Sequence, residues 1–149
     1  MPTVLSMWMI LGFACSEDPG RTHDSHTMHL DTGPMDMTRA GITDGGSFHV
    51  TWVPAPDPIP YNDYFSLEIQ VRDADTGASL TEALSVDVDA QMPAHGHGMN
   101  TKPVTSELGD GLFFTEGMVL HMEGAWELTI DVGLDGVVET ARFDVECCD

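Results

Sequence analysis

A short stretch near residue 95 holds the side chains of this sequence that are best suited to bind a metal ion. Two histidines, His95 and His97, and two methionines, Met92 and Met99, fall within eight residues. A glycine follows each histidine, and glycine lets the backbone bend so that both imidazoles can turn toward one point. Imidazole and thioether groups both bind copper, and the thioethers favour Cu(I). The spacing therefore predicts a copper site built from this loop.

A second group of such side chains precedes a turn at Glu123, where Met118, His121 and Met122 lie close together. The loops of a β-sandwich cluster at its two ends, so this turn could bring His121 to the first loop. Met118 is expected to fill the core, because methionine commonly fills gaps there. The alternative for all of these histidines is that they are solvated or hydrogen-bond to the backbone, with no metal bound.

The charge of the chain excludes several classes of partner. Five Lys and Arg residues stand against 25 Asp and Glu residues, which gives a formal net charge of −20. Such a surface repels phosphate backbones and anionic lipid head groups, so we expect no nucleic-acid partner, whereas cations are attracted. The sequence contains no Gly-x-Ser-x-Gly elbow, phosphate-binding glycine loop or His-Glu-x-x-His motif. We therefore expect a binding module and not an enzyme.

The N-terminal residues predict export. Val4–Ala14 is an apolar run that is too short to span a bilayer as a helix but suits the apolar region of a secretory signal. Cys15 follows directly, as at a bacterial lipoprotein cleavage site. We expect residues 1–14 to be a signal peptide and Cys15 to carry lipid, so that the protein is periplasmic or on the outer surface and touches the membrane only through its anchor. No Lys or Arg precedes the apolar run, which leaves open a start codon upstream of Met1.

Residues 15–46 are expected to form a flexible tether. They are polar, rich in Gly, Pro, Asp, Thr and His, and lack a sustained apolar period. The histidines and methionines of this segment are either a trap for soft metals or solvated parts of a spacer: His23, His26, Met28, His29, Met35 and Met37.

Two adjacent cysteines, Cys147 and Cys148, lie next to the C-terminal residue. Geometry disfavours a disulfide between neighbours in the chain. The pair is interpreted as a dispensable tail, with a soft-metal pair and an intermolecular link as alternatives.

From Ser47 onward apolar and polar residues alternate. The alternation is clear in four segments, residues 48–53, 65–72, 84–90 and 126–132, and a turn at Leu134–Gly136 leads to a fifth that ends at Val145. Pro54 is expected to begin a turn, and Phe113, Met118 and Leu120 are assigned to a further strand pair. Alternation marks strands with one face on a core and one in water. Such strands, separated by turn signals and without helical periodicity, predict an all-β, two-sheet antiparallel sandwich.

Three stretches together resemble the YtkA-like domain family, which has relatives around the FixH proteins. They are MPAHGHGM from Met92, GDGLF from Gly109 and GMVLHMEGAWEL from Gly117. The family has a loop of the form MP-x-H-G-H-G and a hairpin of the form F-x-M-x-G-x-W-x-L. The resemblance covers roughly residues 46 to 146 and places the domain at residues 47–146. It implies an immunoglobulin-like sandwich outside the cytoplasm, often anchored by lipid.

Position by position, the resemblance covers Met92, Pro93, His95, Gly96, His97 and Gly98 in the loop and Met122, Gly124, Trp126 and Leu128 in the hairpin. Leu120 stands where the family often has an aromatic residue, and His121 has no place in the family's pattern.

Two functions follow from this reading. The first is a copper-binding module that buffers or delivers the metal outside the cytoplasm, with a site drawn from Met92, His95, His97, Met99 and His121. The second is an immunoglobulin-like structural or interaction domain that binds an envelope protein without metal.

Overall fold

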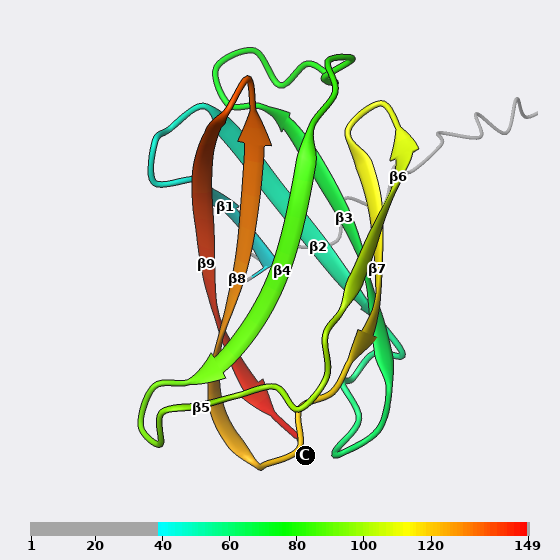
Figure 1. The fold of residues 1–149 in the computed structure, drawn as a ribbon, viewed down its shortest axis with the longest axis vertical. Coiled ribbons are helices and arrows are strands. Elements are labelled where there is room, and N and C mark those ends of the chain that lie inside the picture. Colours follow the sequence, from blue (N-terminus) through cyan, green and yellow to red (C-terminus); the bar gives the residue numbers. More distant parts are fainter. Residues whose placement is uncertain (1–38, 149) are drawn as a thin grey trace, which may run out of the picture. The chain divides into compact units, whose positions relative to one another are not determined.

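Residues 39–148 are the part of the chain that the computed structural model describes, and they contain nine β-strands and no α-helix (Figure 1). The strands are β1 (Ala40–Ile42), β2 (Phe48–Ala55), β3 (Phe65–Asp73), β4 (Ser85–Met92), β5 (His97–Gly98), β6 (Val104–Gly109), β7 (Leu112–Met118), β8 (Gly124–Leu134) and β9 (Val137–Cys147). Within this described range no helix is long and apolar enough to cross a membrane.

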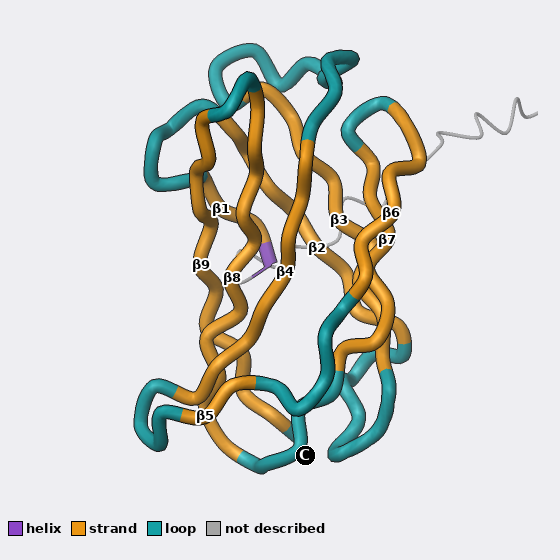
Figure 2. Tube along the Cα trace, viewed as in Figure 1, coloured by secondary structure: helices purple, strands orange, loops and turns teal. Residues whose placement is uncertain are grey.

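The strands form two antiparallel sheets. One sheet has the order β1-β2-β3-β7-β6 and the other the order β5-β4-β8-β9. Figures 1 and 2 show the two layers facing each other, with loops gathered at the two ends. The predicted all-β, immunoglobulin-like antiparallel sandwich is therefore confirmed.

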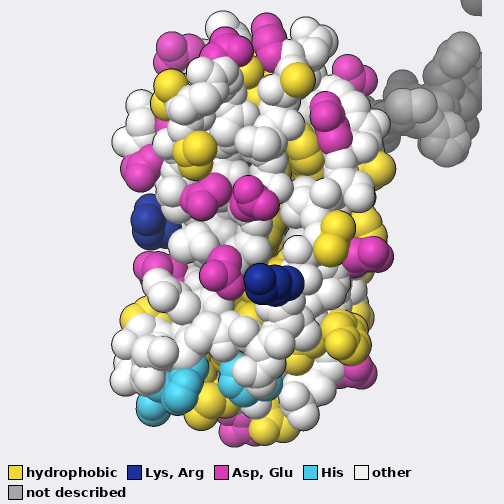
Figure 3. Space-filling view, viewed as in Figure 1, with side chains coloured by type: hydrophobic (Ala, Val, Ile, Leu, Met, Phe, Trp, Pro, Cys, Tyr) yellow, Lys and Arg dark blue, Asp and Glu magenta, His cyan; other side chains and the backbone are white. Residues whose placement is uncertain are grey.

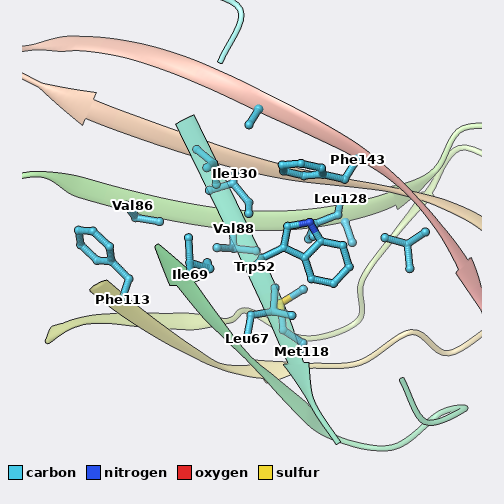
Figure 4. Packing of buried hydrophobic residues seen from close by; sticks show 14 of the residues in the cluster. Trp52, Leu67, Ile69, Val86, Val88, Phe113, Met118, Leu128, Ile130 and Phe143 are labelled. Atoms are coloured by element: carbon cyan, nitrogen blue, oxygen red, sulfur yellow. The ribbon is translucent and has the colours of Figure 1, made fainter. Parts of the chain in front are cut away.

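Alternation of apolar and polar residues builds the core between the sheets. In β4 every second side chain is buried, from Val86 to Met92, while those between them are exposed. Trp52 from one sheet meets Phe143 from the other edge to face, with ring centroids 5.9 Å apart. Figure 4 shows these rings and the aliphatic side chains around them between the two layers. Met118, which is fully buried, fills the core as predicted.

The longest hairpin has the two-residue turn that its sequence predicts. β8 and β9 pair over eleven positions, from Gly124 opposite Cys147 to Leu134 opposite Val137. The turn consists of Asp135 and Gly136, which have φ angles of 52° and 82°. Two left-handed residues match the right-handed twist of the flanking strands, and Asp-Gly tolerates this conformation best.

Several boundaries differ from those expected. The sheet begins at β1, before the expected domain start at residue 47, because Ala40–Ile42 pairs with β2. Pro54 lies inside β2 with its side chain buried, so the turn starts later than expected. Leu120 lies after β7 and not in a strand, and it is buried in the core.

The expected signal peptide at residues 1–14, the lipidation of Cys15 and most of the expected tether lie outside the described residues.

Candidate functional site

Four segments, from three separate parts of the sequence, meet at one end of the sandwich. They are the β4–β5 turn, the β5–β6 loop, the β7–β8 loop and the end of β9, and Figure 1 shows them together beside the C-terminus. Residues 92–102, 119–123 and 147–148 are called the His/Met end below. Antiparallel pairing explains this placement, since β8 starts at Gly124 directly opposite Cys147, where β9 ends.

The β4–β5 turn holds the two loop histidines. The carbonyl oxygen of Met92 accepts hydrogen bonds from the backbone N–H groups of His95 (3.1 Å) and Gly96 (2.9 Å). Gly96 has a φ of +64°, a conformation that glycine adopts without steric cost. His97, the first residue of β5, then pairs with Met92, the last residue of β4. The turn is therefore fixed by its backbone, and both imidazoles remain exposed to solvent.

The rings of His95 and His97 lie within reach of a shared ion. Their centroids are 6.3 Å apart and their planes differ by 24°. A metal–nitrogen bond of about 2 Å places an ion about 3 Å from each ring centre, so two rings on one ion lie at most about 6 Å apart. The observed separation is close to this limit, so the two rings can share an ion only when a nitrogen of each points to the space between them.

The two loop methionines differ in burial. Met92 is only 2% exposed and belongs to the core, whereas Met99 is partly buried and packs against it. A side-chain carbon at Gly124 would lie 3.5 Å from Met92 Cε, an ordinary van der Waals contact, so the Met92 methyl group lies next to Gly124. The backbone N–H of Met99 donates a 3.2 Å hydrogen bond to the carbonyl oxygen of Ala90. Met99 thus offers the more accessible thioether.

His121 lies in the β7–β8 loop against an aromatic ring. Its ring meets Trp126 edge to face, with centroids 5.5 Å apart. Its Nδ1 atom is buried and has no hydrogen-bond partner among residues 39–148. A buried polar atom normally has a partner, and an imidazole nitrogen that carries no proton is able to bind a metal. Figure 3 shows histidine side chains gathered at this end of the molecule, next to hydrophobic ones.

Carboxylates and cysteines do not complete a metal site here. Within residues 39–148 there is no group of three or more His, Cys, Asp or Glu side chains placed to hold an ion. The methionine thioethers are the further side-chain ligands that this end offers beside the imidazoles. All five residues proposed from the sequence, Met92, His95, His97, Met99 and His121, lie at this end, and their role as ligands stays a prediction.

The structure also brings to this end Met122 and the two C-terminal cysteines, which the sequence analysis names outside its main set of ligands. Met122 packs against the core, and its carbonyl oxygen accepts a 2.9 Å hydrogen bond from Trp126 Nε1. Cys147 and Cys148 are also here, joined by a disulfide, and the peptide bond between them is cis. The sequence analysis disfavours a disulfide between neighbouring cysteines, and the structure brings their two sulfurs into contact.

A single β-sandwich domain with a His- and Met-rich end is the class of protein that this fold and these loops define. The family model described as YtkA-like matches residues 47–131, more than half of the chain, and the chain belongs to this family. The resemblance to YtkA-like domains in its loop and hairpin motifs is thereby confirmed.

Two solved structures are similar to this chain at low identity. One is a DUF4426 family protein from Pseudomonas aeruginosa, with 11% identity, a TM-score of 0.47, and coverage of 68% of this chain and 91% of that chain. The other is FetP from a uropathogenic E. coli strain, with 10% identity, a TM-score of 0.45, and coverage of 72% and 93%. A search of curated proteins finds no match to this sequence.

Proposed function

We propose that this protein is an extracytoplasmic copper-binding module whose site is the His/Met end. The observation that carries the proposal is the pair of exposed imidazoles of His95 and His97, 6.3 Å apart and 24° from parallel on a backbone-fixed turn. Their two rings supply nitrogen ligands. Met99 supplies a partly exposed thioether, and His121 supplies a further nitrogen from the β7–β8 loop.

Copper fits this set of side chains better than zinc does. Structural zinc sites take four His, Cys or carboxylate ligands, and no such group of even three exists among residues 39–148. Thioether ligands select Cu(I), and imidazole accepts both copper oxidation states. The two histidines with one or two methionines therefore point to copper, with Cu(I) preferred when the methionines take part.

The rest of the chain supports a binding role outside the cytoplasm. Residues 1–14 have the composition of a secretory signal and Cys15 the position of a lipidated cysteine, so we propose a lipid-anchored protein of the periplasm or outer surface. The net charge of −20 raises the local concentration of cations of any kind. The module would buffer copper or deliver it to a partner, and it needs no catalytic group for either task.

Copper titration of the full chain tests the proposal. Cu(I) is titrated anaerobically against a coloured competing chelator, and Cu(II) by isothermal calorimetry. We expect the double variant His95→Ala/His97→Ala to lose at least about tenfold in copper affinity, because it removes two nitrogen ligands. His49→Ala is the matched control, since His49 lies in β2 outside the His/Met end and should leave binding unchanged.

A third variant separates the folded domain from the N-terminal segment. His23→Ala/His26→Ala/His29→Ala removes the imidazoles outside the described residues and is expected to keep the high-affinity site. Equal copper binding by the wild-type protein and the His95/His97 variant would overturn the loop site. Loss of binding in the triple variant instead would assign the metal to the N-terminal segment.

A second function is favoured by one surface feature. The five-stranded sheet exposes Val53, Val104 and Phe114, and Tyr64, just before β3, is 67% exposed. Tyr64, Val104 and Phe114 line one groove beside Lys102. Exposed apolar groups that lie together mark interaction surfaces. If neither copper ion binds the wild-type protein, a non-metal interaction domain of the envelope becomes the better proposal.

A further inference from the structure

The outer face of the four-stranded sheet is strongly acidic. Side chains that alternate with the core residues of β4, β8 and β9 point away from the other sheet. Six carboxylates and one arginine among them give this face a formal charge of −5: Asp87, Asp89, Glu127, Asp131, Asp144, Glu146 and Arg142. Such a face stays hydrated and repels another copy of the chain.

The outer face of the five-stranded sheet is neutral. Its strands contribute two carboxylates, Glu68 and Glu116, and one cation, Arg72. Lys102, just before β6, lines a groove with Glu116 and forms no ion pair within residues 39–148. Two carboxylates and two cations give a formal charge of zero, in a chain whose net charge is −20. Both signs are therefore present on this face in equal number.

The neutral face also carries exposed apolar side chains. They are Ile42, Val53, Val104 and Phe114. Val104 lies opposite the residue two positions after Phe114, so the two side chains are diagonal neighbours, and both line one groove with Tyr64. On the four-stranded sheet, the large apolar side chains described as exposed are Val137 and Val138, beside the hairpin turn. The two outer faces thus differ in apolar character as well as in charge.

We propose that the outer face of the five-stranded sheet is the interface of a homodimer in which two copies pack face to face. A two-fold axis brings the same patch of both copies together, so apolar groups meet apolar groups. Because this patch carries both signs in equal number, each copy also offers cations to the carboxylates of the other. The inference goes beyond the copper proposal and does not depend on it.

This arrangement keeps the acidic faces of the two copies apart. Each copy contributes two sheets, and stacked sheets lie about 10 Å apart, so the two four-stranded sheets of the dimer lie about 30 Å apart. Salt screens charges over about 8 Å at physiological ionic strength, so repulsion between the two acidic faces is largely screened. Packing through the four-stranded sheets would instead press two faces of charge −5 together.

The neutral face is large enough for a specific interface. Four of its five strands have 6 to 9 residues. With a strand spacing of about 4.8 Å and a rise of about 3.3 Å per residue, the face measures about 24 Å by about 25 Å, or about 600 Å² in projection. Specific complexes bury about 800 Å² of accessible surface on each partner, and side chains make the accessible surface of a face larger than its projection. The expected dimer is therefore reversible, with a Kd in the micromolar range.

Sedimentation velocity tests the dimer directly. The full chain carries Cys15→Ser, so that no lipid holds copies together, and a chelator and a reductant exclude metal bridges and intermolecular disulfides. We expect a monomer–dimer equilibrium with a Kd of about 1–100 μM. Raising NaCl from about 20 mM to about 300 mM should lower this Kd, because salt screens the remaining repulsion between the copies. A protein that stays monomeric up to about 500 μM, five times the weakest Kd expected, would overturn the proposal.

The same substitution on the two sheets locates the interface. Val104 is 60% exposed on the neutral face, and Val138 is 63% exposed on the acidic one. We expect Val104→Glu to raise the dimer Kd by about tenfold or more, because it places an extra carboxylate from each copy in the interface. Val138→Glu adds the same charge and should leave the Kd nearly unchanged. Circular dichroism checks that both variants are folded. Equal Kd values for the two variants would contradict the assigned interface.

A cross-linking measurement needs no substitution in the interface. Lys102 is the only lysine of the chain, and a carbodiimide joins its amine to a nearby carboxylate. Mixing unlabelled with heavy-isotope-labelled chains lets mass spectrometry separate links between copies from links within one copy. We expect links between copies from Lys102 to Glu68 or Glu116. Links that run instead to Asp89 or Glu127 on the acidic face would overturn the proposal. Copper enters none of these measurements, so their failure leaves the copper site untouched.

Discussion

At the scale of single residues, Glu139 has the densest hydrogen bonding of any carboxylate in the described range. It accepts hydrogen bonds from Ser47 Oγ and Thr43 Oγ1, each at 2.6 Å, and from the Ser47 backbone N–H at 3.0 Å. The hydrogen bonds from the Ser47 and Thr43 side chains hold the pKa of the Glu139 carboxyl below its ordinary value of 4.5. The carboxylate thereby ties the turn between β1 and β2 to β9.

The lowered pKa of Glu139 predicts a pH-dependent contribution to stability. A group whose pKa is lower in the folded state stabilises the fold above its unfolded pKa, and the effect is lost as the pH falls through the folded value. We expect Glu139→Gln to lower the free energy of unfolding by about 1–3 kcal/mol at pH 7, because an amide cannot accept all three hydrogen bonds. The difference from the wild-type protein should shrink below the ordinary carboxyl pKa of 4.5.

Urea denaturation at a series of pH values measures this difference. Glu146→Gln is the control, since Glu146 is exposed on the same strand. A destabilisation by Glu139→Gln that stays constant down to the most acidic pH would contradict the assigned role.

At the scale of elements, the β6–β7 turn depends on a glycine that touches a neighbouring strand. Gly111 has a φ of +73°, and a side-chain carbon there would meet the carbonyl oxygen of Val71 in β3. At the same place, the backbone N–H of Val71 donates a 2.8 Å hydrogen bond to the carbonyl oxygen of Gly111. The turn therefore docks the β6–β7 hairpin onto β3 through the backbone.

This close approach predicts different costs for two glycine substitutions. Gly136 also has a positive φ, of +82°, but a side-chain carbon added there would have no other atom within 4 Å. We expect Gly136→Ala to cost about 1 kcal/mol for the backbone conformation, and Gly111→Ala about 2–4 kcal/mol because the hairpin must also move. Thermal and urea unfolding measure both values. Equal losses for the two variants would show that the hairpin moves away from β3 freely.

Sequence patterns predict some elements much better than others. β2, β3, β4, β8 and β9 alternate clearly, because one face of each lies on the core. β6 was missed, since nearly all of its side chains are exposed and no period appears. β5 has only two residues, too few for any period, and exists because the turn after Met92 folds it back onto β4.

The candidate site was predictable in its residue types but not in its arrangement. The spacing of His95 and His97 indicated the loop, and the clustering of sandwich loops at two ends made it possible for His121 to join the same end. The burial of Met92, the contact of His121 with Trp126 and the place of Cys147 depend on the pairing of β4 and β9 with β8. The register of these strand pairs cannot be read from the residues of any one strand.

At the scale of the whole molecule, the net charge of −20 affects both binding and stability. Like charges repel one another in the compact state, and salt screens them over about 10 Å at 0.1 M ionic strength. We expect added NaCl to raise the urea concentration at the midpoint of unfolding and to slow the association of Cu(II). Denaturation curves and stopped-flow quenching of tryptophan fluorescence measure the two effects. An association rate that does not depend on salt would show that the charge does not steer the ion.

The end of β9 lies beside the candidate metal ligands, and this placement matters for how the protein is purified. A polyhistidine tag fused after Asp149 would begin two positions after Cys148 and bring extra imidazoles to the His/Met end. Such a tag would bind copper itself and could bridge to His95 or His97, so that the measured affinity would belong to the fusion. A tag removed by proteolysis before titration avoids this artefact.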